Sequence, residues 1–132
     1  MVRQVIVLPF WDWRCLIFYD ATSRDAESIL SVLEEIGCKG SSLERAERNL
    51  YSGLQNTGLT FTNQARHRSI MVIGSASEPA QFWDTLDHEK GHLAEHIAEA
   101  LSLDRSEEEF EYLKGAIARE TYSVAIGYLQ RR

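Results

Sequence analysis

Residues 68–101, RSIMVIGSASEPAQFWDTLDHEKGHLAEHIAEAL, decide the fold, because they join a predicted strand to a predicted long helix. Residues 68–74 are rich in apolar and β-branched side chains, which is typical of a strand. Ser77 is a candidate N-cap, and Pro79 lies in the first helical turn, where a missing N–H breaks no hydrogen bond. A helix to about Leu101 follows, with apolar residues at helical spacing: Phe82, Leu86, Leu93, Ile97 and Ala100.

Three more strands are predicted upstream of this stretch. Residues 58–62, GLTFT, precede a polar turn over residues 63–66, so that they form a β-hairpin with residues 68–74. Residues 2–8 and 14–19 are apolar runs separated by a break that contains Pro, Trp and Asp. We expect these two runs to be short buried strands of a second hairpin.

Two helices are predicted between the strand pairs. Ser23 is a candidate N-cap for a helix that ends near Gly37, where a C-terminal glycine belongs. Its apolar residues recur at helical spacing: Ala26, Ile29, Leu30, Val32, Leu33 and Ile36. Ser41 or Ser42 opens the next helix, which ends at Gly53.

A last helix is predicted after a break at residues 103–106. It carries one apolar stripe: Phe110, Leu113, Ile117, Val124 and Tyr128. The 132 residues suffice for one modest core and include no internal repeat. We therefore expect a single α+β domain over residues 1–132, with a small mixed or antiparallel sheet packed against long helices.

Composition and charge exclude several classes of function. A hydrophobic fraction of 44% and a charged fraction of 26% are typical of a globular protein. The formal charge of -6, without a Lys/Arg cluster, argues against nucleic acid or an anionic membrane as partner. No segment is apolar enough for a membrane span or a signal peptide, so we expect a cytoplasmic protein. Cys15 and Cys38 are expected to be reduced, and Trp11 and Trp13 to offer an apolar contact patch.

The predicted long helix carries a metal-binding motif, HEKGH, at residues 88–92. His88 and His92 are four residues apart, so both imidazoles lie on one helical face and can bind one zinc ion. Zinc lowers the pKa of a bound water from about 16 to about 7, and Glu89 is placed to accept its proton. The motif therefore supplies both a nucleophile and its general base.

The motif lies at the border of the apolar stripe of its helix. Taking 100° per residue, Glu89, His92, His96 and His88 all lie along one edge of that stripe. Ligands at the floor of a cleft need packing on one side and substrate on the other, and such a border position provides both. The simpler interpretation is that these histidines only pack at the edge of the core.

On these residues the chain resembles the zincin metallopeptidases, and the thermolysin-like gluzincin branch most closely. The resemblance rests on HEKGH on a long helix, preceded by a hairpin with strand SIMVIG and followed by an acidic helix. It implies a minimal zincin-like fold, zinc bound by His88, His92 and a glutamate of the following helix, and Glu89 as general base. It also implies a peptide or protein substrate extended along the strand from Ile70 to Gly74. Lys90 departs from the uncharged residues usual inside the motif.

Two weaker resemblances concern other parts of the chain. Residues 57–120 are similar to uncharacterised proteins of phages and mobile elements of gut bacteria, mainly through the HExxH motif. IGCKGS around Cys38 faintly resembles the cysteine ligand region of peptide deformylase. The glycine-rich segment of that family is missing near the N-terminus, so Cys38 is better interpreted as a small buried hydrophobe.

The third zinc ligand is the open question of the sequence. Glu109 is the preferred candidate, because it lies at the rim of the apolar stripe of the last helix. Its competing interpretation is a capping box with Ser106. Other acidic candidates lie beside it: Glu107, Glu108 and Glu111. His96 is about 12 Å from His88 along an unbroken helix, too far for one ion, so we expect it to line the cleft or support a ligand.

Further roles are less specific. The inverted motif HxxEH over residues 92–96 would make Glu95 the base, but Glu95 lies further from the apolar border than Glu89. Asp87 is a candidate to orient a ligand imidazole, and Tyr112 or Tyr122 to stabilise an oxyanion.

The sequence thus favours a zinc metallopeptidase that hydrolyses peptide bonds. The alternative is a non-catalytic protein of a phage or mobile element that binds zinc or a partner. A deformylase-like amide hydrolase is the third hypothesis.

Overall fold

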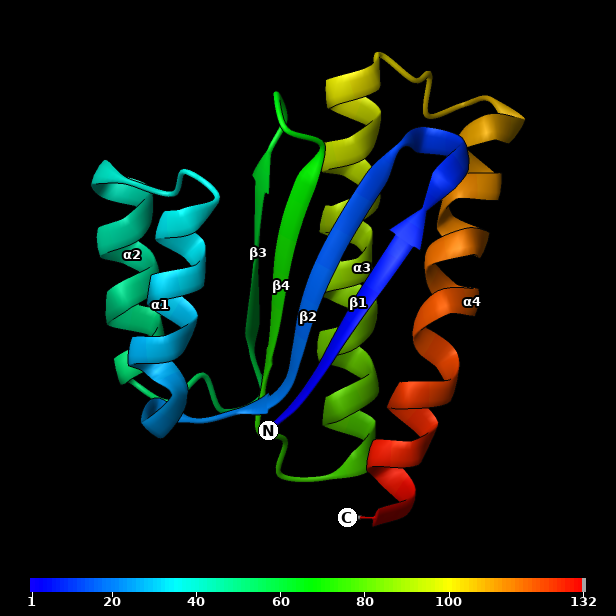
Figure 1. Ribbon diagram of the computed structural model, residues 1–132. Coiled ribbons are helices and arrows are strands. Elements are labelled where there is room, and N and C mark those ends of the chain that lie inside the picture. The colour runs from blue at the N-terminus through cyan, green and yellow to red at the C-terminus, as the bar shows by residue number, and fades with distance from the viewer. Residues whose placement is uncertain (132) are drawn as a thin grey trace.

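The computed structural model describes residues 1–131, which form four strands and four α-helices (Figure 1). The strands are β1 (Val2–Leu8), β2 (Trp13–Ala21), β3 (Gly58–Asn63) and β4 (Arg68–Gly74). The helices are α1 (Ala26–Glu35), α2 (Gly40–Tyr51), α3 (Pro79–Leu101) and α4 (Glu108–Arg131). Two 3-10 turns, η1 (Pro9–Trp11) and η2 (Ser23–Asp25), complete the order. The predicted strands and helices are all present, which confirms the α+β class.

The strands form one mixed sheet in the order β1-β2-β4-β3. β1 pairs with β2, and β3 with β4, in antiparallel fashion, as predicted for two hairpins. The two hairpins join at the centre, where β2 and β4 run parallel. A parallel pair needs a long crossover, and residues 22–67 supply it. Both edges of β4 are therefore paired, whereas β1 and β3 are the edge strands.

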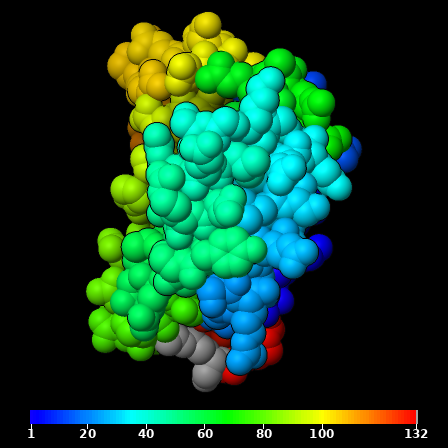
Figure 2. Space-filling model, turned by 90° about the vertical axis from the view of Figure 1, so that its left-hand side faces the viewer, coloured from blue at the N-terminus to red at the C-terminus, as the bar shows by residue number. Residues whose placement is uncertain are grey.

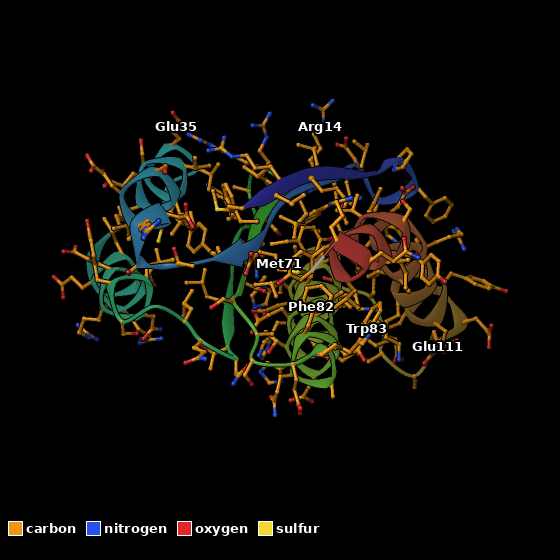
Figure 3. The ribbon with its side chains drawn as sticks, turned by 90° about the horizontal axis from the view of Figure 1, so that it is seen from below. Arg14, Glu35, Met71, Phe82, Trp83 and Glu111 are labelled. Atoms are coloured by element: carbon orange, nitrogen blue, oxygen red, sulfur yellow. The ribbon has the colours of Figure 1, made fainter. Side chains whose placement is uncertain are left out.

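Helices cover both faces of this sheet. α1 and α2 pack on one face, and α3 and α4 on the other, as the view from below shows (Figure 3). The α1–α2 layer, coloured blue to green, covers most of the face seen in Figure 2. The sheet therefore lies between two helical layers.

The sheet separates two apolar clusters. Alternate residues of β2 point to opposite faces: Cys15 and Ile17 join the cluster under α3 and α4, and Phe18 joins the cluster under α1 and α2. In Figure 3, Met71 and Phe82 lie in the first of these clusters, between the sheet and α3. Trp13 is 1% exposed and belongs to the same cluster. The prediction that Trp13 contributes to an apolar surface patch is therefore wrong.

Local signals fix the helix ends. Gly37, with φ +96°, follows α1 in the left-handed region that glycine adopts at no steric cost. Ser77, the predicted N-cap of α3, lies one residue before the observed N-cap Glu78. Its backbone N–H donates instead to Asn56 Oδ1 at 2.9 Å, which ties the start of α3 to the loop before β3.

Two further expectations concern residue chemistry and length. Cys15 and Cys38 are both buried and free, as predicted. None of the helices within residues 1–131 combines the length and the apolar character that crossing a membrane requires.

Candidate metal centre

His88 and His92 converge on one point beside the middle of α3. They lie one helical turn apart, both side chains are exposed, and their Nε2 atoms are 3.0 Å apart. Their rings stand nearly perpendicular, with centroids 4.5 Å apart. Two ligands of a tetrahedral zinc ion with bonds of about 2.05 Å would have nitrogens about 3.3 Å apart. The observed separation therefore fits a shared metal ion.

A hydrogen bond between the two rings is the other interpretation of this distance. Both rings face solvent, where water competes for each nitrogen, so such a bond contributes little to stability. A third donor lies close by, because ligand atoms of His88, Glu89 and His92 are all within 4.8 Å of one another. Within residues 1–131 no other trio of His, Cys, Asp or Glu meets this condition.

Glu89 is the buried member of the group, with 4% of its surface exposed. Its Oε1 accepts a hydrogen bond of 2.7 Å from Thr60 Oγ1 on β3. Gly58 permits this close approach of β3 to α3, because a Cβ there would lie 3.0 Å from Glu89 Cγ. The carboxylate is therefore held between the edge strand and the two histidines.

A small pocket of 240 Å³ opens next to His88 and Glu89. Its other walls come from the loop before β3, the start of β3 and the preceding turn of α3: Asn56, Thr57, Gly58, Asp84 and Thr85. Thr85 Oγ1 donates to the carbonyl of Asn56 at 3.1 Å, which fixes the loop against the helix. The pocket offers room for a small group beside the carboxylate.

His96 lies outside the candidate metal group, which consists of His88, Glu89 and His92, and is one helical turn beyond His92. The two rings are stacked at 29° with centroids 6.2 Å apart. His96 Nδ1 is 2.8 Å from Thr62 Oγ1 on β3. Burial lowers the pKa of the His96 imidazole, and the neighbouring His92 lowers that pKa further. His96 therefore lies beside the group of His88, Glu89 and His92 without joining it.

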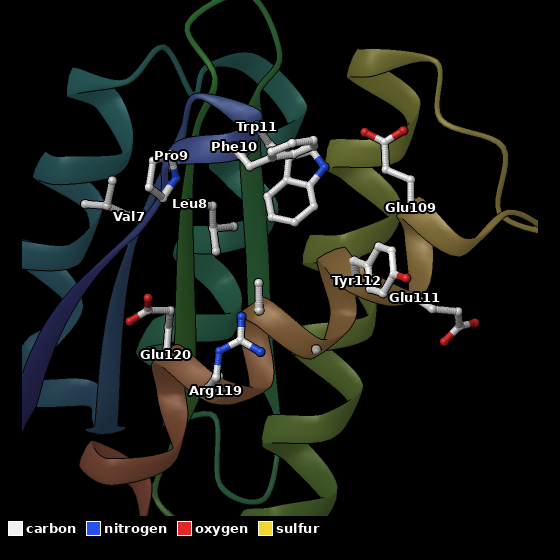
Figure 4. A pocket seen from close by; sticks show the side chains of 12 residues that line it. Val7, Leu8, Pro9, Phe10, Trp11, Glu109, Glu111, Tyr112, Arg119 and Glu120 are labelled. Carbon is white, nitrogen blue, oxygen red and sulfur yellow. The ribbon is translucent and has the colours of Figure 1, made fainter.

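Glu109 is not brought to the histidines. It lies in the first turn of α4 and lines a pocket of 730 Å³ between α4 and the segment from β1 to η1 (Figure 4). α4 runs along β1, where Gln4 Nε2 donates to the Glu120 carbonyl at 2.7 Å. His96 of α3 contacts Thr62 of β3, whereas α4 lies on the side of α3 away from β3 (Figure 1). The metal group of residues 1–131 contains no residue of α4.

The neighbours of Glu109 have other partners or none at this site. Glu111 forms an ion pair of 3.1 Å with Lys114 and lines the same pocket by α4. Glu107 and Glu108 are exposed beside it. The Ser106 backbone N–H donates to Asp104 Oδ1 at 2.9 Å. That aspartate thus occupies the place that a capping box would have given to Glu109.

The remaining sequence candidates are also placed by the structure. Glu95 of the inverted motif forms an ion pair with Arg105, and Asp87 forms one of 3.0 Å with Lys90. Cys38 lies in the cluster under α1 and α2, on the face of the sheet opposite α3, so no deformylase-like ligand set is assembled. Tyr112 and Tyr122 are exposed on α4, and Tyr112 lines the pocket there.

The strand available to an extended ligand is β3 and not β4. Residues Ile70 to Gly74, the predicted binding strand, belong to β4, whose two edges are occupied by β2 and β3. This part of the prediction is wrong, because hairpin order along the chain does not reveal which strand becomes the edge. The strand next to α3 with an open edge is β3.

The open edge of β3 presents the backbone groups that do not pair with β4. Gly74 N–H donates to the Thr57 carbonyl at 2.9 Å, and the Thr62 and Ser69 hydroxyls are 2.7 Å apart, as in a closely spaced pair that exchanges no backbone bonds. By alternation we infer that the N–H and C=O groups of Gly58, Thr60 and Thr62 point to the open edge. Thr60 and Thr62 also direct their side chains to α3.

Sequence reasoning missed Thr60 and Gly58, whose roles depend on the register between β3 and α3. Scans against protein-family models, curated proteins and solved structures each gave no match. The side chains that α3 and β3 bring together are thus the features that bear on function.

Proposed function

We propose that this protein is a zinc-dependent peptidase with a minimal zincin-like site, in which His88 and His92 hold the metal and Glu89 is the general base. The observation that carries this proposal is the convergence of two exposed Nε2 atoms, 3.0 Å apart, beside a buried carboxylate. Exposed imidazoles gain little from meeting each other, whereas a divalent cation stabilises that arrangement.

The role of the metal is that of a Lewis acid. A zinc ion held by these residues would lower the pKa of a water to about 7 and polarise a peptide carbonyl. The chain supplies two imidazoles, which are donors that zinc prefers, and the Glu89 carboxylate lies beside them. Glu109 is placed too far around α3 to join them, so we assign no third protein ligand on α4.

Glu89 is suited to move the proton. A carboxylate oxygen of Glu89 lies within 4.8 Å of a ring nitrogen of each histidine, so a water held by a metal at these nitrogens would be within its reach. Thr60 holds Oε1 by its hydroxyl, and burial keeps the carboxylate away from bulk water. The carboxylate can accept a proton from that water and return it to the amine that leaves. Glu89 is therefore assigned as base rather than as ligand.

The open edge of β3 supports a peptide as the substrate. An extended chain added to that edge would pair with the backbone groups of Gly58, Thr60 and Thr62. The same strand contacts Glu89 through Thr60. A peptide bond carried along this edge would thus pass the carboxylate and the pocket beside it.

The experiment combines zinc binding with proteolysis. We expect the purified protein to bind one zinc per chain by isothermal titration and to release fragments from a labelled casein. His92→Ala should abolish both, whereas His67→Ala, in the turn between β3 and β4, should leave both unchanged. Glu89→Gln should keep zinc and lose hydrolysis, with Glu95→Gln on the same helix as its matched control.

The outcomes separate the hypotheses. Equal zinc binding by the wild type and His92→Ala would refute the metal site. Loss of zinc in Glu89→Gln would make Glu89 a ligand instead of the base. Zinc binding without any hydrolysis would support the non-catalytic zinc protein, which is the second candidate because α4 contributes no ligand.

A further inference from the structure

A chain of hydrogen bonds runs from strand to strand, over β2, β4 and β3, and ends at His96 on α3. Trp13 Nε1 donates to Ser69 Oγ at 3.0 Å, Ser69 Oγ is 2.7 Å from Thr62 Oγ1, and Thr62 Oγ1 is 2.8 Å from His96 Nδ1. Its members come from β2, β4, β3 and α3 in turn. Trp13 and Ser69 are 1% and 2% exposed, so water does not complete their hydrogen bonding. None of these four residues belongs to the candidate metal group of His88, Glu89 and His92.

The chemistry of the groups gives the chain a direction. An indole N–H can only donate, so Ser69 accepts from Trp13. Each hydroxyl has one proton, which Ser69 gives to Thr62, and Thr62 in turn gives to His96. In the opposite direction Ser69 would accept from both sides, and its buried proton would have no acceptor in the chain. With Thr62 passing its proton along the chain rather than to solvent, His96 Nδ1 is the acceptor and the neutral ring carries its proton on Nε2.

The Nε2–H of His96 is free to meet a ligand. Among residues 1–131 this nitrogen has no hydrogen-bond partner. The one buried side-chain nitrogen or oxygen without a partner in this part of the chain is Trp11 Nε1, so Nε2 of His96 is accessible to solvent. The ring lies beside His92, on the side of α3 that faces β3. An N–H donor of fixed tautomer thus borders the proposed cleft.

The position of this donor along β3 can be estimated. Thr60 contacts Glu89 and Thr62 contacts His96, and two residues of a strand span about 7 Å. A peptide on the open edge of β3 would carry its side chains on the same alternation, so the residue opposite Thr62 would direct its side chain to α3. That residue lies two positions from the one next to Glu89.

We propose that His96 is a specificity-determining residue, which donates its Nε2–H to a hydrogen-bond acceptor on the substrate side chain two residues from the cleaved bond. This inference rests on the proposed peptidase function. It names the preferred substrates as peptides with Gln, Asn, Glu or Asp at that position. The Trp13–Ser69–Thr62 chain serves to keep the donor on the nitrogen that faces the ligand.

The first test reads the tautomer and needs no hydrolysis. Long-range ¹H–¹⁵N NMR spectra of the full chain with zinc added should show His96 with its proton on Nε2. Thr62→Val, which keeps the shape and removes the hydroxyl, should give a mixture of tautomers, and Thr62→Ser should restore the single form. A proton on Nδ1 in the wild type would overturn the proposal.

The second test compares two peptides that differ only in Gln or Met at the position two residues from the cleaved bond. We expect kcat/KM to be about 3- to 10-fold higher for Gln, the size of one neutral hydrogen bond. His96→Leu should erase this preference, His96→Gln should retain it through its amide N–H, and His67→Leu should leave it unchanged. A preference that persists in His96→Leu would overturn the assignment.

The two tests also separate this inference from the proposed function. If the protein cleaves no peptide, the peptidase proposal fails and the specificity role fails with it, although the tautomer result still decides the direction of the hydrogen-bond chain. If the protein cleaves peptides without regard to the Gln/Met exchange, the peptidase proposal stands and the role of His96 fails.

Discussion

Gly58→Ala tests whether β3 must lie against α3 for the site to form. A Cβ at residue 58 would be 2.4 Å from the Val72 carbonyl oxygen and 3.0 Å from Glu89 Cγ. An ordinary C···O contact is about 3.3 Å, so the backbone of β3 would have to shift by about 1 Å. Val72 is fully buried in β4 and offers no flexible side-chain end that could give way.

The expected cost follows from that overlap. Overpacking of a well-packed site costs about 1 to 3 kcal/mol. The lower chain entropy of unfolded alanine returns about 0.4 to 1 kcal/mol. The midpoints of these ranges, about 2 and about 0.7 kcal/mol, give a net loss of about 1.3 kcal/mol, which lowers Tm by roughly 5 °C for a chain of this size. Thermal unfolding followed by circular dichroism measures this shift, and hydrolysis of the labelled casein by the folded variant should fall, because the added Cβ displaces Glu89.

Gly91→Ala is the matched control, since Gly91 lies within the HEKGH motif. A Cβ there meets no atom within 4 Å, and alanine is favoured over glycine inside a helix by up to about 1 kcal/mol. Tm should rise or stay constant, with zinc binding unchanged. The reasoning is refuted if Gly58→Ala melts at the wild-type temperature, or if both glycine variants lose stability equally.

Two further predictions concern buried groups. Thr60→Val removes a hydrogen bond to a buried carboxylate and should lower the unfolding free energy by about 2 kcal/mol. In the Glu89→Gln background the same substitution should cost only about 1 kcal/mol. Urea unfolding of the four proteins measures both costs, and equal costs would contradict the contact. Burial raises the pKa of the Cys15 and Cys38 thiols, so both stay protonated at pH 8. Both thiols should therefore resist iodoacetamide until the protein unfolds, and rapid labelling of the native chain would contradict their burial.

The elements of this fold were predictable because their signals are local. A short polar turn between two apolar runs, residues 58–62 and 68–74, predicts a hairpin, and β3 and β4 form one there. Gly37 marks the end of α1 by its left-handed backbone. The parallel pairing of β2 with β4 depends on contacts far apart in the sequence. The order of the strands, and with it the identity of the edge strand, was therefore not readable.

The candidate site shows the same division. His88, Glu89 and His92 were predicted as a group because helical geometry alone brings residues one turn apart together. Helical spacing places Glu109 at the rim of an apolar stripe, but a stripe has two rims, and spacing does not show which rim faces the histidines. Only the packing of α4 along β1 shows that its first turn faces the pocket at η1. The partner of Glu89, Thr60, likewise depends on strand register.

The division of the interior into two clusters has a consequence for how such a chain can change over time. Leu59 and Phe61 of β3 pack under α1 and α2, whereas Thr60 and Thr62 contact the helix that bears the histidines. Substitutions in the α1–α2 layer therefore remodel one wall of the β3 edge without disturbing the side chains on the other. Evolution, or a designer, can vary what this edge accepts while the chemistry on the opposite wall stays the same.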